Sequence, residues 1–225
     1  MGISLKRRFP RWKIWASFIT EITLERTYDR NDKILTVCLS RGRVQLYTEN
    51  AIYSWEDRYT QFREVFYHLA PTLKGKKEVL LLGLGLGSIP FILEKKLGLF
   101  ANYTAVECDE QIIYLAEKYL LKYLDSPMCT MHADALAFPT YTKERYDIIC
   151  VDVFEDQVTP LAFFSKKYLE NLRKCMGSGG LLLFNILRTQ RPPVETIAAV
   201  FPGAYPFRSG ENDVWVAWKN NSRIG

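Results

Sequence analysis

The chain has 225 residues, 48% of them hydrophobic and 24% charged, which is typical of a globular protein with a sizeable core. Its net charge of +5 allows an anionic ligand and requires none. Five scattered cysteines without a C-x-x-C pair argue against a disulfide scaffold and fit a reducing cytoplasm, and two histidines without metal-ligand spacing lead us to expect no metal.

The N-terminus carries five basic residues before position 14, followed by a short apolar run at 14–19. This start resembles a signal peptide, but the run is short, contains Ser17 and lacks a small-residue cleavage site. No run in the chain approaches the ~18 residues that span a bilayer, so we expect no membrane contact. We interpret the segment as a solvated basic tail; an arm that contacts anions or RNA is the alternative.

Residues 20–49 alternate apolar and polar side chains in short runs separated by turn residues, which predicts a small antiparallel sheet. Residues 56–70 change to a helical period, with an aromatic stripe that includes Tyr59. We predict an amphipathic helix that packs by this stripe and ends at Pro71. We therefore divide the chain into 1–55, the basic tail with the small antiparallel β region, and 56–225, the larger nucleotide-binding region.

From residue 78 onward, predicted strands and helices alternate, which is typical of a parallel sheet with helices on both faces. The final two strands are joined by a short turn and should form an antiparallel hairpin at one edge. We expect an α/β, Rossmann-like fold with a mostly parallel seven-stranded sheet. The strands are predicted at 79–82, 103–106, 129–132, 146–151, 181–184, 204–207 and 214–218, the helices at 110–124, 160–176 and 192–200, and a glycine turn at 177–180.

The most informative stretch is 78–93, where a short apolar strand leads through Gly83, Gly85 and Gly87 into a helix. Glycines let a ligand approach the backbone, and the first turn of the helix offers free N–H groups. Ser88 takes the last position of the dinucleotide fingerprint Gly-x-Gly-x-x-Gly, so the match to that motif is incomplete. A plain strand-to-helix connection is the alternative.

Acidic residues follow three successive predicted strands. Glu107 lies 24 positions after Gly83, close to the spacing of a ribose-binding acid. Asp134 follows the next strand and Asp152 the one after, with Glu155 and Asp156 close behind. Since the carboxyl ends of parallel strands meet at one edge of a sheet, these acids should surround one ligand. No Gly-Lys-Ser/Thr motif indicates a phosphate; an acidic mouth suits a positively charged nucleoside such as S-adenosylmethionine.

Together these features resemble the class I S-adenosylmethionine-dependent methyltransferase superfamily, specifically its spermidine synthase-like (polyamine aminopropyltransferase) branch, over about residues 39–187. The segment 41–45, Arg-Gly-Arg-Val-Gln, followed by Tyr53, resembles the family's Asp-Gly-x-x-Gln segment and the Tyr after it. Asp152, followed by Pro160, resembles the catalytic Asp of the family's Asp-Ser-Ser-Asp-Pro loop.

The resemblance implies a role for each of these residues. Asp152 would be the base that deprotonates an acceptor amine, while Glu155 or Asp156 would hold a distal amine. The acceptor would lie against Tyr53 and Phe154. The residues that would hold S-adenosylmethionine, or its decarboxylated form, are Gln45, Gly83, Gly85, Gly87, Glu107, Asp134, Ala135 and Asp152. Polyamine synthases typically form dimers through the N-terminal sheet, so a homodimer is expected.

Several positions depart from the family pattern. Leu86 stands where the family has an Asp that helps to hold the amine of the aminopropyl donor. Val153 and Phe154 replace the two serines of the catalytic loop, and Asn185 stands near a missing Gly-Glu. These changes make the expected acceptor half of the site more apolar than in the family, whereas the cofactor half keeps its pattern.

We therefore expect an S-adenosylmethionine-dependent transferase of spermidine synthase-like fold, a methyltransferase with an unknown small-molecule acceptor. The first alternative is a polyamine aminopropyltransferase that uses decarboxylated S-adenosylmethionine. Others are a non-catalytic nucleotide-binding interaction module, a nicotinamide-dependent oxidoreductase and a nucleic-acid methyltransferase. No Asn/Asp-Pro-Pro-aromatic run follows the fourth strand, so we expect no nucleic-acid substrate.

Overall fold

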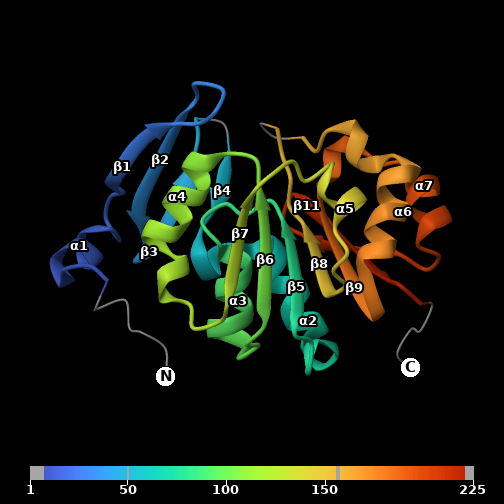
Figure 1. The fold of residues 1–225 in the computed structure, drawn as a ribbon. Helices are drawn as coiled ribbons and strands as arrows, with labels where there is room; N and C mark the ends of the chain where they lie inside the picture. Colours follow the sequence, from blue (N-terminus) through green and yellow to red (C-terminus); the bar gives the residue numbers. More distant parts are fainter. Residues whose placement is uncertain (1–7, 50, 156–157, 221–225) are drawn as a thin grey trace.

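The computed structural model describes residues 8–49, 51–155 and 158–220, and within them it has two separate sheets (Figure 1). The smaller sheet is antiparallel and contains β1 (Ile22–Tyr28), β2 (Ile34–Ser40), β3 (Arg43–Tyr47) and β4 (Ile52–Ser54). The larger sheet has seven strands in the order β10-β11-β9-β8-β5-β6-β7. The expected α/β class, the mostly parallel seven-stranded sheet and the small N-terminal sheet are confirmed.

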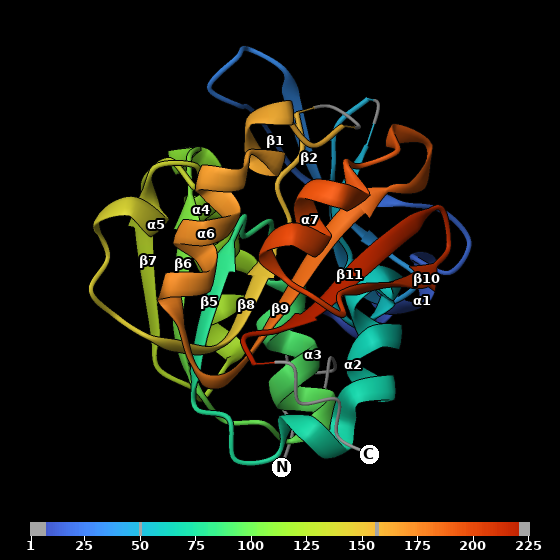
Figure 2. The same ribbon diagram turned by 90° about the vertical axis from the view of Figure 1, so that its right-hand side faces the viewer.

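Five strands of the larger sheet run parallel, and two form its antiparallel edge. The parallel strands are β5 (Glu78–Leu82), β6 (Asn102–Glu107), β7 (Met128–His132), β8 (Tyr146–Val151) and β9 (Met176–Leu187). The strand β11 (Asn212–Trp218) pairs antiparallel with β9, and β10 (Tyr205–Ser209) pairs with β11 at the edge seen in Figure 2. The predicted edge hairpin is confirmed.

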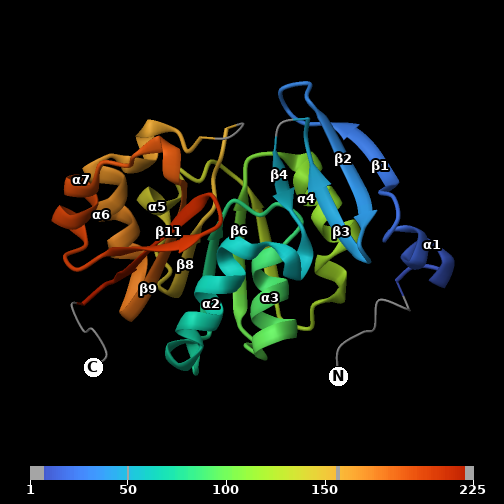
Figure 3. The same ribbon diagram turned by 180° about the vertical axis from the view of Figure 1, so that it is seen from behind.

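Helices cover both faces of this sheet because its strands are apolar on both sides. In β5, Val79 and Leu81 pack in the cluster that includes α2 (Thr60–Leu73) and α3 (Ser88–Leu97), which lie in front of the sheet in Figure 3. Leu80 and Leu82 pack on the other face, against residues of α5 (Phe138–Tyr141), α6 (Lys166–Cys175) and α7 (Val194–Val200). The remaining helices are α1 (Arg11–Ala16) and α4 (Glu110–Tyr119), and the 3-10 turns are η2 (Glu56–Arg58), η3 (Leu121–Tyr123), η4 (Leu161–Phe164) and η5 (Arg188–Gln190).

A third apolar cluster joins the small sheet to the large one. Leu35 and Leu39 of β2 pack there with Ile112 of α4 and with Leu86 of the glycine turn. All four side chains are buried. Leu86 therefore stabilises the junction between the two sheets.

Several predicted boundaries are wrong for local reasons. The helix α2 continues through Pro71 to Leu73, since a proline in its last turn removes one backbone hydrogen bond without ending the helix. The predicted glycine turn at 177–180 belongs to β9, where the register with β8 shifts and the chain passes through a bulge. The predicted helices 110–124 and 160–176 each divide into an α-helix and a 3-10 turn.

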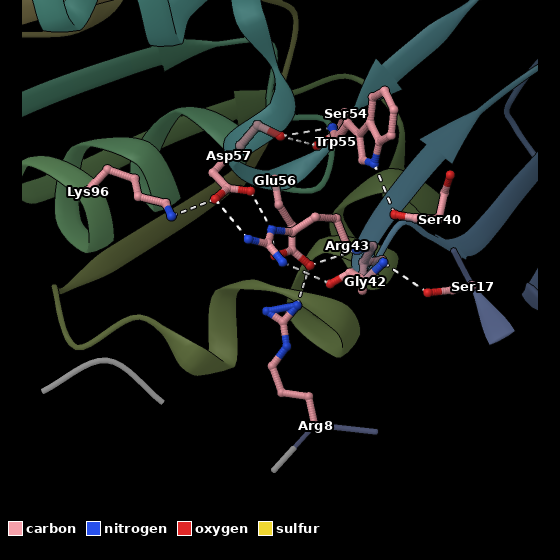
Figure 4. A network of polar contacts seen from close by, with 12 residues as sticks. Arg8, Ser17, Ser40, Gly42, Arg43, Ser54, Trp55, Glu56, Asp57 and Lys96 are labelled. Atoms are coloured by element: carbon pink, nitrogen blue, oxygen red, sulfur yellow. Dashed lines mark hydrogen bonds and ion pairs between the residues drawn. The ribbon is translucent and has the colours of Figure 1, made fainter. Parts of the chain in front are cut away.

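A buried network of charges ties the N-terminal segment to the body of the molecule (Figure 4). Asp57 forms ion pairs with Arg43 and Lys96, both at 2.5 Å. Glu56 is fully buried; it pairs with Arg8 and accepts a hydrogen bond from the Val44 N–H at 2.7 Å. Burial raises the pKa of Glu56, whereas Arg8 opposes this rise. Because an unpaired buried charge is costly, the network fixes residues 8, 43, 56, 57 and 96 relative to one another.

Candidate active site

A cavity of about 440 Å³ opens at the carboxyl ends of β5, β6 and β8, where ligands bind in open α/β sheets. Its size is suited to a nucleoside-sized ligand. Residues from the small sheet, the glycine turn, the strand ends and the edge hairpin contribute to it. The lining residues are Ala51, Ile52, Tyr53, Tyr59, Gln61, Gly83, Leu84, Gly85, Glu107, Cys108, Ile112, Asp152, Val153, Phe154, Leu187, Glu211 and Asn212.

The glycine turn allows two other segments to come very close to it. Gly83 has φ +91°, and a Cβ added there would lie 2.2 Å from the carbonyl oxygen of Asp152. Gly85 has φ +53°, and its Cβ would lie 2.9 Å from the carbonyl oxygen of Tyr53. Because Gly83 and Gly85 lack side chains, the backbones of Asp152 and Tyr53 can both lie close to this turn.

Ser88 connects the small sheet to this turn. Its hydroxyl lies 2.7 Å from the Ser54 hydroxyl and accepts a hydrogen bond from the Trp55 N–H at 3.1 Å. Both serines are buried. The residue that breaks the dinucleotide fingerprint therefore holds the end of β4 against the first turn of α3.

The Glu107 carboxylate joins the glycine turn to the residues that directly follow β6. One oxygen accepts from the Leu84 N–H at 3.0 Å, and the other accepts from the N–H groups of Cys108 and Asp109 at 2.8 and 3.2 Å. Burial raises the pKa of Glu107, and the three N–H groups oppose this rise. The Cys108 thiol donates to the same carboxylate, so a ligand hydroxyl would take the place of this weak donor.

Asp152 lies at the centre of a hydrogen-bond network assembled from distant elements. The Tyr59 hydroxyl donates to its two oxygens, at 3.0 and 2.8 Å, and the Asn185 side-chain amide donates at 2.9 Å. The Asn212 amide donates in turn to the Asn185 oxygen at 3.0 Å, which sets the orientation of the Asn185 amide.

Burial raises the pKa of Asp152 from its usual 3.8 to about 6, while the bonds from Asn185 and Tyr59 oppose the rise. Burial and the neighbouring Asp152 also raise the pKa of Tyr59, so this tyrosine remains a hydrogen-bond donor at neutral pH. A carboxylate with such a pKa, held in a cavity, can accept a proton near neutral pH.

The cavity is acidic. Among the described residues that line it, Glu107, Asp152 and Glu211 carry carboxyl groups and none is a lysine or arginine. Glu211 is exposed and lies in the turn of the edge hairpin. Uncompensated carboxylates in a partly enclosed space favour a cationic ligand.

The structure brings six of the residues singled out in the sequence to this cavity: Tyr53, Gly83, Gly85, Glu107, Asp152 and Phe154. Gly87 instead forms the N-cap of α3. Gln45 is buried, accepts a hydrogen bond from the Cys38 thiol and lines a separate depression with Glu21 and Thr48.

Three further candidates stand apart from the cavity, and a fourth lies outside the described residues. Asp134 is exposed and accepts a hydrogen bond from the Leu136 N–H at 2.7 Å, while Ala135 is buried in the apolar core. Glu155 is exposed and forms a bridge with Val158. Asp156 is the candidate outside the described residues.

Sequence reasoning missed Tyr59, Asn185 and Glu211. The helical period places Tyr59 in the core stripe of 56–70, and it does pack on Phe62, yet its hydroxyl reaches Asp152. Asn185 lies near the carboxyl end of β9, so the strand-end rule that selects Asp152 could have selected it. Glu211 had no such signal, because a polar residue in a hairpin turn is ordinary.

Within the described residues, no group of three His, Cys, Asp or Glu side chains could hold a metal ion. The cysteines described are free; Cys38, Cys150 and Cys175 are buried, Cys108 is half-buried and Cys129 is exposed. In the same part of the chain, no helix has the length and apolar character needed to cross a membrane.

Comparison with known proteins places this site in context. Residues 60–190, more than half of the chain, match the family model described as the spermine/spermidine synthase domain. A probable polyamine aminopropyl transferase of Bifidobacterium longum is 30% identical over 118 residues, 52% of this chain and 26% of that protein. A polyamine aminopropyltransferase of Thermoplasma acidophilum is 28% identical over 72% of this chain and 56% of that protein. The chain thus spans about a quarter to about half of these relatives.

Solved structures share the fold at low sequence identity. The spermidine synthase of Thermotoga maritima matches with a TM-score of 0.68 and 15% identity, covering 90% of this chain and 75% of that one. Human methyltransferase-like protein 13, solved in complex with SAH, matches with a TM-score of 0.62 and 21% identity, covering 72% and 84%. At these identities the two matches show a shared fold.

Proposed function

This chain belongs to the spermine/spermidine synthase family, and we propose that it transfers the aminopropyl group of decarboxylated S-adenosylmethionine to an amine. The names of the relatives support aminopropyl transfer over methyl transfer, which was the first expectation from the sequence. The observation that carries the proposal is the charge of the cavity: three carboxyl groups and, among the described lining residues, no lysine or arginine.

This charge distinguishes the two donors. Intact S-adenosylmethionine carries a carboxylate, which three neighbouring carboxylates would repel. The decarboxylated form has an ammonium and a sulfonium without that anion, so the same lining attracts it. The Glu107 carboxylate, where a ribose hydroxyl could replace the weak Cys108 thiol donor, and the bare backbone of Gly83 and Gly85 suit a ribose.

Asp152 is the proposed general base. The acceptor amine must lose a proton to become a nucleophile, and a carboxylate with a pKa of about 6 is ionised at neutral pH and can take that proton. Tyr59 and Asn185 hold its two oxygens in place. The amine nitrogen would form a bond to the donor carbon next to the sulfonium while the bond from that carbon to sulfur breaks, and the neutral thioether nucleoside would leave.

Glu211 is the proposed partner of a second, distal ammonium on the acceptor. It lines the cavity from the edge hairpin, whereas Glu155, which the family resemblance assigns to this role, does not. Phe154 and Leu187, which line the same cavity, would pack against the methylene groups of a linear diamine.

Glu211→Gln is expected to raise the KM for putrescine about tenfold and to weaken donor binding much less, because Glu211 faces the distal amine while Glu107 and Asp152 still face the donor. Steady-state kinetics with varied putrescine measures the effect, and Glu195→Gln, an exposed glutamate of α7, is the matched control. An unchanged KM for putrescine would remove Glu211 from acceptor recognition.

Methyl transfer is the second candidate, and Leu86 favours it. The family's Asp at this position helps to hold the amine of the aminopropyl donor, whereas Leu86 is fully buried in the apolar cluster between the two sheets. The amine therefore has one carboxylate fewer to bind.

Calorimetric titration of the purified protein with each form of the donor separates the two candidates. We expect tighter binding of decarboxylated S-adenosylmethionine by at least about tenfold, equivalent to about 1.4 kcal/mol, and aminopropyl transfer to putrescine. Tighter binding of the intact form would instead assign methyl transfer. Binding of neither would refute the transferase proposal as a whole.

A further inference from the structure

An exposed aromatic and basic surface lies on α1 and the residues that follow it. Trp12 and Trp15 are 65% and 71% exposed, and Phe18 and Ile19 are 60% and 91% exposed. Trp12 and Trp15 are three residues apart in a helix and so lie on one face. Two basic residues, Arg11 and Lys13, share this helix. We call the set of six the N-terminal patch: Arg11, Trp12, Lys13, Trp15, Phe18 and Ile19.

The segment that carries the patch is already attached to the molecule by other residues. Phe9 and Ile14 pack against the apolar cluster between the sheets. The Arg8 guanidinium pairs with buried Glu56 (Figure 4). It also lies 4.9 Å from the centre of the Tyr123 ring.

The other end of the segment is held equally well. Ser17 accepts the Gly42 N–H on its hydroxyl at 2.9 Å and the Arg41 N–H on its carbonyl at 2.7 Å. The Trp12 and Trp15 side chains are therefore presented on a fixed segment and are not needed to attach it, whereas the edge of the Phe18 ring lies against Gly42. Clustered apolar exposure of this kind marks an interaction surface.

The charge around the patch identifies the kind of partner. Arg11 and Lys13 are the cations of the patch itself, and the described part of this segment, residues 8–20, contains no aspartate or glutamate. Arg41, whose backbone bonds to Ser17, adds another exposed cation next to the segment. Aromatic rings beside cations are typical of segments that lie in the interface of an anionic bilayer, with the rings at headgroup depth.

We propose that the N-terminal patch binds the surface of an anionic lipid membrane. Trp12, Trp15 and Ile19 would enter the interface, and Arg11 and Lys13 would face acidic headgroups. Figure 1 shows α1 at the outer edge of the small sheet, at the opposite end of the molecule from α7. The proposal revises the expectation of no membrane contact, which rested only on the lack of a run long enough to span a bilayer. It does not depend on the proposed enzymatic activity.

Sedimentation with vesicles tests the proposal on the full chain. Wild-type protein is expected to sediment with vesicles of phosphatidylcholine containing roughly one third phosphatidylserine, and about tenfold less with phosphatidylcholine alone. Binding should fall when salt is raised from about 50 to about 500 mM, because the attraction is screened. Trp12→Ser with Trp15→Ser, and separately Arg11→Gln with Lys13→Gln, should each weaken binding about tenfold or more.

Phe18→Ser and Phe100→Ser provide a matched pair, since both side chains are 60% exposed and only Phe18 belongs to the patch. Only Phe18→Ser should reduce vesicle binding, and neither should change the unfolding temperature by more than about 2 °C. The proposal is overturned if wild-type protein ignores anionic vesicles or if the two substitutions act alike. A dimer in light scattering that dissociates with Trp12→Ser and Trp15→Ser, without vesicle binding, would assign the patch to a second copy; RNA binding alone would assign it to nucleic acid.

Discussion

Asp152→Asn is expected to lower kcat for aminopropyl transfer by about 10²- to 10⁴-fold while donor binding is largely retained. The physical reason is that an amide cannot take the proton of the acceptor amine, although it can keep the hydrogen bonds from Tyr59 and Asn185. Single-turnover kinetics with a saturating donor measures the chemical step, and calorimetry checks the binding. A loss of less than about tenfold would exclude Asp152 as the general base.

The same substitution should stabilise the fold in a pH-dependent way. Because the folded-state pKa of about 6 lies above the usual 3.8, ionised Asp152 destabilises the folded state, and this cost is fully present above pH 6 and absent below about pH 4. Asp152→Asn should therefore raise the free energy of unfolding by up to about 3 kcal/mol at pH 8 and about half as much at pH 5. Thermal unfolding at the two pH values measures it.

Two variants make this test specific. Asp32→Asn removes an exposed carboxylate in the turn after β1 and should neither lower kcat nor stabilise the fold in a pH-dependent way.

Tyr59→Phe removes a donor that stabilises ionised Asp152, so the acid limb of the pH–rate profile should move from about pH 6 to higher pH by about one unit. An unchanged limb would mean that another group sets the profile.

Gly83→Ala is expected to destabilise the protein by at least about 4 kcal/mol, equivalent to a fall of about 8 °C or more in the unfolding temperature. Two effects combine: the backbone has φ +91°, and the new methyl group would lie 2.2 Å from the carbonyl oxygen of Asp152. Relief of this collision must separate the ends of β5 and β8, so donor binding should also be lost.

Gly75→Ala is the matched control, because Gly75 has a similar φ of +83° and nothing within 4 Å of an added Cβ. It should cost only about 1–2 kcal/mol and leave donor binding intact. If Gly83→Ala yields no folded protein while Gly75→Ala does, the collision is supported; equal stability of the two variants would show that the turn can move away from Asp152.

How far the sequence predicts this site depends on how local each signal is. The alternation of apolar strands and amphipathic helices predicts the α/β fold without any knowledge of contacts, since the spacing of apolar residues indicates whether an element is buried on one face or on both. Because parallel strands end at one edge, the glycine turn, Glu107 and Asp152 follow from counting strands. All three line the cavity.

The tertiary structure alone decided the partners of these residues. Tyr59 donates a hydrogen bond to Asp152 although the two are 93 positions apart in the sequence, because α2 begins beside the carboxyl end of β8. Asn185, 33 positions from Asp152, also donates to it, because β9 pairs with β8. The periodicity of apolar residues does not predict hydrogen bonds between residues this far apart in the sequence. For the same reason Gln45, which the family resemblance assigned to the donor, lies in another depression, and Leu86 is turned into the core between the sheets. The sequence by itself determined the elements and the acids at their ends; packing determined which polar side chains surround Asp152 and therefore its pKa.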